Sequence, residues 1–305
     1  MKILLTLLST LAAVGIGSAH AQDIPVRFAF PSGINGQLPK VIEQAGIAQK
    51  YGFAPTFNFF QYGPPMIEAL AAGQVDVIFT SLNPTASYLA KNPGGLVIIA
   101  DAGSSKHAVV VPKDSPIQSL KDFKGKKVAV SYNSDLHVDV VQAFKELGLD
   151  KDVELVNIQP LELAGAYEQG LTDGVDIRVP PLFALTEKKG GRIVQEWPWQ
   201  FVVAVRKGFI EEHPGVVEKL REVLKDGIWY IASHPDEAAK WWGDHLRQAP
   251  EIVKKSADLN PLSHVKRREE INIVPSAEFK AKAEKWSQAL VDSGIGKTKI
   301  TYIYE

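Results

Sequence analysis

The chain has 305 residues, a formal net charge of -1 at neutral pH and no cysteine. The lack of cysteine excludes a disulfide framework, a thiolate metal site and a cysteine nucleophile. Acidic and basic residues are mixed along the chain, which argues against a surface for nucleic acid or for an anionic membrane. We therefore expect a protein that is stabilised by its hydrophobic core, with a chain long enough for one large or two medium domains.

The first 21 residues have the pattern of a secretory signal peptide. Lys2 provides a positive start, residues 3–17 form an uncharged apolar run, and residues 18–21 (SAHA) offer a small-residue cleavage site. We expect cleavage before Gln22 and export to the periplasm. Because no cysteine follows the cut, no lipid anchor is expected. No later run reaches the roughly 18 apolar residues of a membrane span, so direct insertion into the membrane is not expected either.

Strands and helices alternate in the segment that follows the signal. The pattern predicts strands over residues 24–30, 56–60, 75–79 and 96–100, with helices over residues 37–49, 64–72 and 84–91. Strands and helices that alternate at this spacing are typical of parallel βαβ units, in which helices cover both faces of the sheet. The class is therefore α/β.

The pattern restarts near residue 108. It predicts strands over residues 108–111, 127–130, 153–158, 174–177 and 201–205, helices over residues 136–147 and 161–169, and a helical end from residue 214. We interpret this as two lobes. Lobe 1 comprises residues 22–108 and 203–305, lobe 2 comprises residues 109–202, and two strand crossings near Ala108 and Val202 form a hinge.

Two segments share a common pattern of a helix, a glycine and then an aspartate between hydrophobic residues. Residues 66–76 end at Asp76, and residues 166–176 end at Asp176. The glycine permits a left-handed exit from the helix, and the aspartate enters the next strand. Each lobe thus has the same helix-to-strand corner, and a ligand is expected in the crevice between the lobes, at the carboxyl ends of the strands.

Four fragments in fixed order carry a family resemblance. They are residues 46–53 (GIAQKYGF), 69–76 (ALAAGQVD), 110–117 (VVPKDSPI) and 120–130 (LKDFKGKKVAV). The chain resembles, over nearly its whole length, the NMT1-like periplasmic binding proteins for sulfonates, nitrate and taurine of ATP-driven ABC importers. The resemblance implies a type II periplasmic-binding-protein fold. It also implies a monomer that hands a small-molecule ligand to a membrane permease, with no cofactor, no metal and no reaction.

Polar segments lie where four of the expected strands pass into helices, at residues 32–37, 61–63, 81–84 and 131–137. Free backbone N–H groups at helix starts, together with hydroxyl and amide side chains, suit an oxyanion such as sulfonate or carboxylate. The expected ligand contacts are Asn35, Gly36, Gln37, Gln61, Tyr62, Ser81, Asn83, Ser104, Ser131, Asn133, Ser134, His137 and Arg178. Tyr62 is expected either to stack on the ligand or to line the rim of the site.

Two positions depart from the family pattern. The loop after residues 127–130 is serine-rich and ends in His137, as in the family, but it also holds Asp135; we expect this carboxylate to cap the helix that follows. Arg178 stands where relatives have aromatic residues. It is expected either to clamp an acidic ligand group in the cleft or to pair with Asp173 or Asp176 at the surface, and the residues leave both open.

Three readings of the function remain. We favour a binder of a small organic anion, with sulfonate ahead of carboxylate. A binder of a neutral heteroaromatic, such as a thiamine-precursor pyrimidine, would use Tyr62, Asn83 and Asp135. An enzyme like the fungal pyrimidine synthases of the same fold is not expected, because those use a cysteine-rich motif. No nucleophile elbow surrounds Ser134 and no H-x-x-x-H pair suggests a metal.

Overall fold

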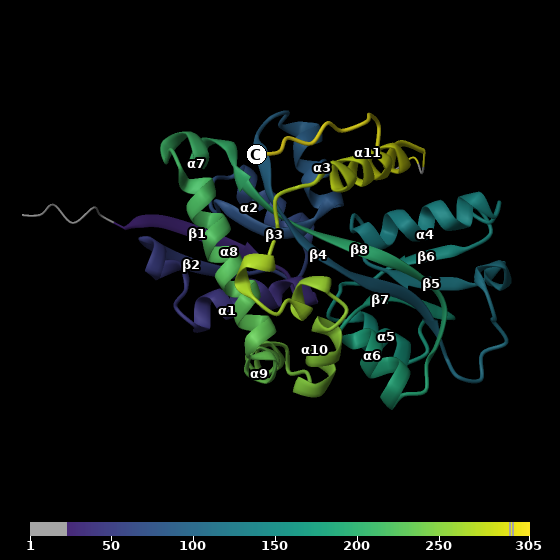
Figure 1. The fold of residues 1–305 in the computed structure, drawn as a ribbon. Helices are drawn as coiled ribbons and strands as arrows, with labels where there is room; N and C mark the ends of the chain where they lie inside the picture. The colour runs from purple at the N-terminus through teal and green to yellow at the C-terminus, as the bar shows by residue number, and fades with distance from the viewer. Residues whose placement is uncertain (1–22, 293, 295) are drawn as a thin grey trace, which may run out of the picture.

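The computed structural model describes residues 23–292, 294 and 296–305 (Figure 1). The expected signal peptide therefore lies outside the described residues. In the part of the chain that is described, no helix is both long and apolar enough to cross a membrane.

The described strands form one eight-stranded sheet in the order β2-β1-β3-β8-β4-β7-β5-β6. The strands are β1 Ile24–Phe30, β2 Phe53–Phe59, β3 Val77–Ser81, β4 Leu96–Val111, β5 Lys127–Val130, β6 Glu154–Asn157, β7 Gly174–Arg178 and β8 Arg192–Arg206. Strand β1 runs parallel to β2 and β3, and β5 runs parallel to β6 and β7. The pairs β3–β8, β8–β4 and β4–β7 are antiparallel. We call the part with β1–β3 the first half and the part with β5–β7 the second half.

Strands β4 and β8 run through both halves (Figure 1). The sequence predicted two separate strands over residues 96–100 and 108–111, in two separate sheets. Residues 101–107 instead continue β4, because they pair with β8 at Ser104–Gln200 and Ser105–Trp199. The α/β class and the fold type agree with the prediction, but hydrogen bonds join the two expected sheets into one.

Helices cover both faces of the sheet (Figure 1). They are α1 Gln37–Gln44, α2 Gly63–Ala71, α3 Leu82–Lys91, α4 Asp135–Glu146, α5 Leu163–Glu168, α6 Pro181–Phe183, α7 Lys207–Glu212, α8 Val216–Ser233, α9 Pro235–Leu246, α10 Pro250–Ala257 and α11 Ala277–Asp292. In the first half, α1, α8, α9 and α10 pack on one face and α2, α3 and α11 on the other. In the second half, α4 lies on one face, with α5 and α6 opposite.

The helix predicted over residues 37–49 is shorter in the structure. Helix α1 ends at Gln44, and Gly46 adopts a positive φ of 59° before a short 3-10 turn over Ala48–Tyr51. A left-handed residue interrupts the hydrogen-bond ladder of a helix, so the chain turns at Gly46. Helix α7 was not predicted, and α10 lies within the helical end predicted from residue 214 without having been given bounds of its own.

The repeated glycine and aspartate occupy equivalent places in the two halves. Gly73 and Gly170 both have left-handed backbones, with φ of 66° and 65°. Asp76 is buried and accepts hydrogen bonds from Arg27 (Nη2, 2.7 Å) and Arg206 (Nη2, 3.0 Å). Burial alone would raise the pKa of Asp76, but these two arginines lower it below its usual value.

The second repeated aspartate binds a histidine instead. Asp176 Oδ1 lies 2.9 Å from Nδ1 of His107, and Asp139 Oδ2 lies 3.0 Å from Nε2 of the same ring. The imidazole is 0% exposed and stacks on Trp197. Burial alone would lower the pKa of His107, but the two carboxylates raise it to about 10, so the ring is protonated at neutral pH.

Candidate ligand-binding site

Arg178 lies at the meeting point of the two halves. It is the last residue of β7, its side chain is buried, and its Nη2 donates to Ser32 Oγ (3.2 Å) and to the carbonyl oxygen of Gln61 (3.2 Å). Both acceptors belong to loops that follow β1 and β2 in the first half. The guanidinium also lies over the ring of Trp199, 5.3 Å from the centroid.

The alternative in which Arg178 pairs with a nearby aspartate at the surface is wrong. Asp176 is hydrogen-bonded to His107, and Asp173 accepts a hydrogen bond from the backbone N–H of Lys127. Strand β7 is buried along its whole length, and Arg178 is itself only 8% exposed, so its side chain does not lie on the surface.

No carboxylate forms an ion pair with Arg178 within the described ranges. Its two acceptors, Ser32 and Gln61, are neutral. Burial lowers the pKa of Arg178 to about 10, and the more distant charge of Asp135 opposes that shift. A buried cation without a bonded counter-charge is expensive, and an anion that enters the site would relieve the cost.

The pocket around Arg178 has mostly apolar walls. Its cavity volume is about 40 Å³, well below the roughly 300–1,000 Å³ of small-molecule sites, so a ligand would need the two halves to separate. We call this pocket the cleft pocket. Its lining residues are Ser32, Ser131, Leu136, Pro160, Leu161, Leu163, Ile177, Arg178, Pro181, Leu246 and Gln248. Arg178 is the charged member of this described set, and Ser32, Ser131 and Gln248 are its polar members.

Ser131 and Ser134 shape the loop before α4. Ser131 donates to the carbonyl of Ile158 (2.8 Å), and Ser134 donates to the carbonyl of Ser131 (2.6 Å). Ser134 is the N-cap of α4, since its Oγ accepts from the backbone N–H of His137. Asn133 completes the turn with a φ of 60°. The loop is therefore held by its own hydrogen bonds, with Ser131 facing the cleft pocket.

Asp135 does not cap its own helix, contrary to our expectation, because Ser134 holds that position. Its buried carboxylate reaches the first half, where it accepts from Ser81 Oγ and from the backbone N–H of Asn83 (3.1 Å) at the start of α3. Asn83 Nδ2 donates back to the carbonyl of Asn133 (2.8 Å). Asp135 thus caps a helix of the opposite half. We call Ser81, Asn83, Asn133 and Asp135 the clasp.

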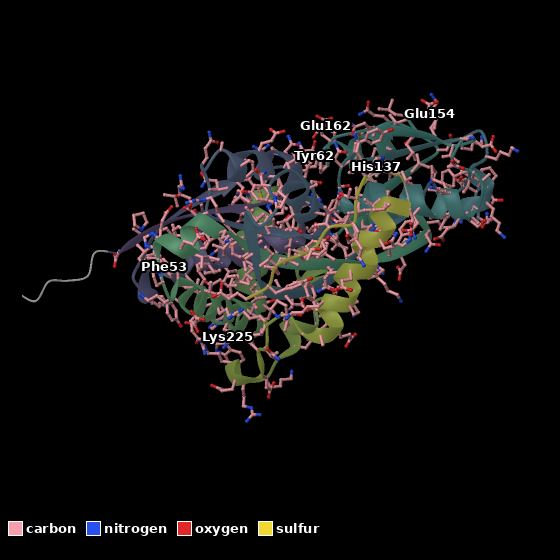
Figure 2. The ribbon with its side chains drawn as sticks, turned by 90° about the horizontal axis from the view of Figure 1, so that it is seen from above. Phe53, Tyr62, His137, Glu154, Glu162 and Lys225 are labelled. Carbon is pink, nitrogen blue, oxygen red and sulfur yellow. The ribbon has the colours of Figure 1, made fainter. Side chains whose placement is uncertain are left out.

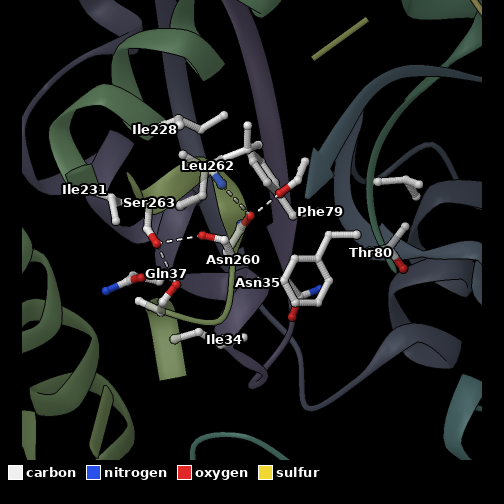
Figure 3. A pocket seen from close by; sticks show the side chains of 15 residues that line it. Ile34, Asn35, Gln37, Phe79, Thr80, Ile228, Ile231, Asn260, Leu262 and Ser263 are labelled. Carbon is white, nitrogen blue, oxygen red and sulfur yellow. Dashed lines mark hydrogen bonds between the residues drawn. The ribbon is translucent and has the colours of Figure 1, made fainter. Parts of the chain in front are cut away.

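Asn35 and Gln37 lie in a second pocket, apart from the cleft pocket (Figure 3). This pocket of the first half is bounded by β3, β8 and α8 and is lined mainly by apolar residues. The side-chain amide of Asn35 and Nε2 of Gln37 are buried without a hydrogen-bond partner. Gly36 beside them packs so closely against Pro31 and Trp242 that no side chain would fit there.

The remaining predicted contacts are spread along the boundary of the halves. Tyr62 is half-buried just before α2. Ser104, on β4, is the register partner of Gln200 on β8. His137 stacks on Tyr132, with ring centroids 4.3 Å apart, and burial lowers the pKa of its imidazole. Figure 2 shows Tyr62 and His137 in the region between the two halves.

The structure therefore divides the predicted residues into groups. Ser131 and Arg178 line the cleft pocket, and the carbonyl oxygen of Gln61 accepts from Arg178. Ser81, Asn83 and Asn133 belong to the clasp, and Asn35 and Gln37 face the second pocket. The prediction missed the apolar walls, which include Leu161, Leu163 and Leu246. These leucines carry no local signal, because only the packing of distant helices brings them to one pocket.

A two-half α/β molecule with a pocket and a buried arginine at the junction of the halves has the architecture of a periplasmic binding protein. Solved structures agree. The aliphatic sulphonate binding protein SsuA of Escherichia coli matches with a TM-score of 0.73 at 18% identity, covering 90% of this chain and 89% of that one. The alkanesulfonate-binding protein SsuA of Xanthomonas axonopodis pv. citri bound to MOPS matches with a TM-score of 0.76 at 16% identity, covering 92% and 96%.

The sequence comparisons identify the family. The NMT1/THI5-like family model matches residues 58–238, more than half of the chain, and the chain belongs to this family. It is 30% identical over 262 residues to the taurine-binding periplasmic protein of Escherichia coli K12, covering 82% of this chain and 77% of that relative. These relatives are named as binding proteins, in agreement with the expected absence of enzymatic activity.

Proposed function

We propose that the protein is the extracytoplasmic solute-binding component of an ATP-driven importer. It captures a small organic anion in the cleft pocket and delivers it to a membrane permease. The family and the printed names of the relatives support the carrier role. Export through the signal in residues 1–21, a mature form without a lipid anchor and a monomeric state belong to the same proposal.

The negative charge of the ligand is inferred from Arg178. Its guanidinium is buried at the junction of the halves, is bonded only to the neutral groups Ser32 and Gln61, and has no carboxylate within ion-pair distance among the described residues. A guanidinium matches a sulfonate or carboxylate with two parallel hydrogen bonds. Sulfonate is the preferred acid group, because two relatives are named for taurine and alkanesulfonate.

Binding proceeds by hinge closure in this proposal. Residues 22–108 with 203–305 form one lobe and residues 109–202 the other, and the paired strands β4 and β8 are the hinge. The ligand meets Arg178 and Ser131 from the second lobe and Ser32 from the first. Because the site is complete only when the lobes meet, bound ligand shifts the population toward the closed form that the permease recognises.

The test is isothermal titration of Arg178→Met with propanesulfonate, benzenesulfonate and butanoate. We expect the affinity to fall by about 100-fold or more, because a charge-assisted bidentate contact is lost. Arg267→Met removes an arginine from the exposed surface and is the matched control, with unchanged affinity expected. Unchanged affinity in Arg178→Met, or binding of neutral pyrimidines alone, would contradict the proposal.

A further inference from the structure

The clasp joins the two halves by hydrogen bonds between the protein's own groups. Asp135 of the second half is 6% exposed, and its carboxylate oxygens accept from Ser81 Oγ and from the backbone N–H of Asn83 (3.1 Å) in the first half. Asn83 Nδ2 donates in the opposite direction, to the carbonyl oxygen of Asn133 (2.8 Å). Hydrogen bonds to a charged group are stronger than those between neutral groups. The halves therefore cannot separate here without a substantial loss of bonding.

Apolar packing closes the same side of the junction. Val138 follows Asp135 by one turn of α4, is fully buried, and belongs to the same apolar cluster as Leu82 and Ala86 of α3. The first turn of α4 is thus held against the first half by polar and apolar side chains together. Separation of the halves would expose Val138 to water, which adds to the cost of breaking the clasp.

Arg178 forms a second set of bonds across the junction. Its Nη2 donates to Ser32 Oγ and to the carbonyl oxygen of Gln61, both at 3.2 Å and both in the first half. In this form the cleft pocket has a volume of about 40 Å³, enough for water but too small for an organic acid. Separation of the halves breaks the bonds to Ser32 and Gln61 and frees the guanidinium for an anion. The clasped form and the form that admits a ligand are therefore alternatives.

We propose that Asp135 is an autoinhibitory residue: through the clasp it holds the halves in a form that excludes the ligand, so the ligand enters only those molecules in which the clasp is open. The inference rests on the proposed function. The apparent affinity of such a protein is its intrinsic affinity reduced by the fraction of molecules that are open. Asp135 thereby determines the ligand concentration at which the carrier becomes filled.

The test measures the separation of the halves and the affinity in the same variants. Because the chain has no cysteine, spin labels can be attached through Glu68→Cys in α2 and Glu162→Cys just before α5, two exposed positions on opposite halves. Double electron–electron resonance then gives the distance between the labels without ligand. We expect one short distance with Asp135 in place and an additional longer distance in Asp135→Asn. Propanesulfonate should bind Asp135→Asn about 10-fold more tightly in isothermal titration.

Two further variants separate the clasp from the charge of Asp135. Asn83→Ala loses the bond to Asn133 but keeps the carboxylate, and we expect the longer label distance and about 3-fold tighter binding. Asp122→Asn is the matched control, because Asp122 accepts from the backbone N–H and the Oγ of Ser119 within the second half alone. Both the label distance and the affinity should be unchanged in Asp122→Asn.

An unchanged label distance in Asp135→Asn would overturn the inference. Tighter binding without a longer distance would overturn it as well, because relief of charge repulsion alone would explain that result. Weaker binding in both Asp135→Asn and Asn83→Ala would show that the clasp assists the ligand, which is the opposite of the inference. Failure of the parent protein to bind any sulfonate or carboxylate would instead overturn the proposed function, and the label distances would still test the clasp.

Discussion

Two buried cations face each other across β4 and β7, and the protein treats them differently. His107 and Arg178 are register partners in the antiparallel pair. Two carboxylates bind the imidazole of His107, whereas the guanidinium of Arg178 meets only neutral oxygens. The buried cation of the framework, His107, therefore has bonded carboxylates, whereas the buried cation that faces the cleft, Arg178, has none.

The first half repeats the framework arrangement. Asp76, the counterpart of Asp176 in the repeated corner, binds Arg27 and Arg206 at the far end of the sheet. Each half thus uses its repeated aspartate to neutralise a cation on neighbouring strands. Arg178 is the exception to that arrangement, which supports its assignment to the ligand.

Loss of a framework counter-charge should have the largest effect. In Asp176→Asn, His107 is left with one carboxylate in a fully buried site, and we expect the free energy of unfolding to fall by about 3 kcal/mol. Urea denaturation measures this change. Asp114→Asn, at an exposed position, is the matched control and should stay within about 0.5 kcal/mol of the parent. A small loss in Asp176→Asn would mean that His107 is neutral.

The pH dependence of the free energy of unfolding should show that His107 is held as a cation by its carboxylates. The pKa of His107 is raised from 6.5 to about 10 in the folded protein, so its contribution is complete below 6.5 and is lost as the pH rises toward 10. Between pH 7 and 9 the free energy of unfolding should fall by about 2 kcal/mol from this group. The slope of the free energy of unfolding against pH should be much reduced in His107→Gln. Equal slopes in the variant and the parent would show that the pH dependence does not come from His107.

A variant of Asp135 tests the claim that Arg178 has no counter-charge, because Asp135 is the carboxylate whose charge acts on Arg178. If it only caps α3, Asp135→Asn should cost about 1 kcal/mol, the usual value of an N-cap, in thermal or urea unfolding. Ser134→Ala removes the cap of α4 and is the matched reference, with a similar loss. A loss of 3 kcal/mol or more in Asp135→Asn would show that Asp135 is the counter-charge of Arg178.

The smallest effect on stability is expected from Arg178 itself. Replacing a buried charge that lacks a bonded partner by a hydrophobic side chain is neutral or stabilising. The free energy of unfolding of Arg178→Met should therefore equal that of the parent or exceed it by up to about 1 kcal/mol. His107→Gln should be destabilised under the same conditions. A marked loss in Arg178→Met would show that its bonds to Ser32 and Gln61 are structural.

Much of the fold could be predicted from local patterns, and much of the site could not. Strands β1 and β5 have the predicted bounds, because their alternation is local and their ends are marked by turn residues. Residues 101–107 are too polar to suggest a strand and become one only through pairing with β8. The orientation of Arg178 and the reach of Asp135 depend on loops more than 50 residues away, which local patterns do not report.

In the proposed hinge, the passage of β4 and β8 between the halves limits where the molecule can bend. Two separate linkers would bend anywhere, but a hydrogen-bonded ribbon yields where its ladder is irregular. That place is the register shift between Asp101 and Ser104, where Gly103 has a φ of 85° and Gln200 donates to Asp101 (2.6 Å) and to the Gly103 carbonyl (2.9 Å). In the proposed closure we therefore expect the halves to turn about this place, and ligands of different length to be enclosed at different angles between the halves.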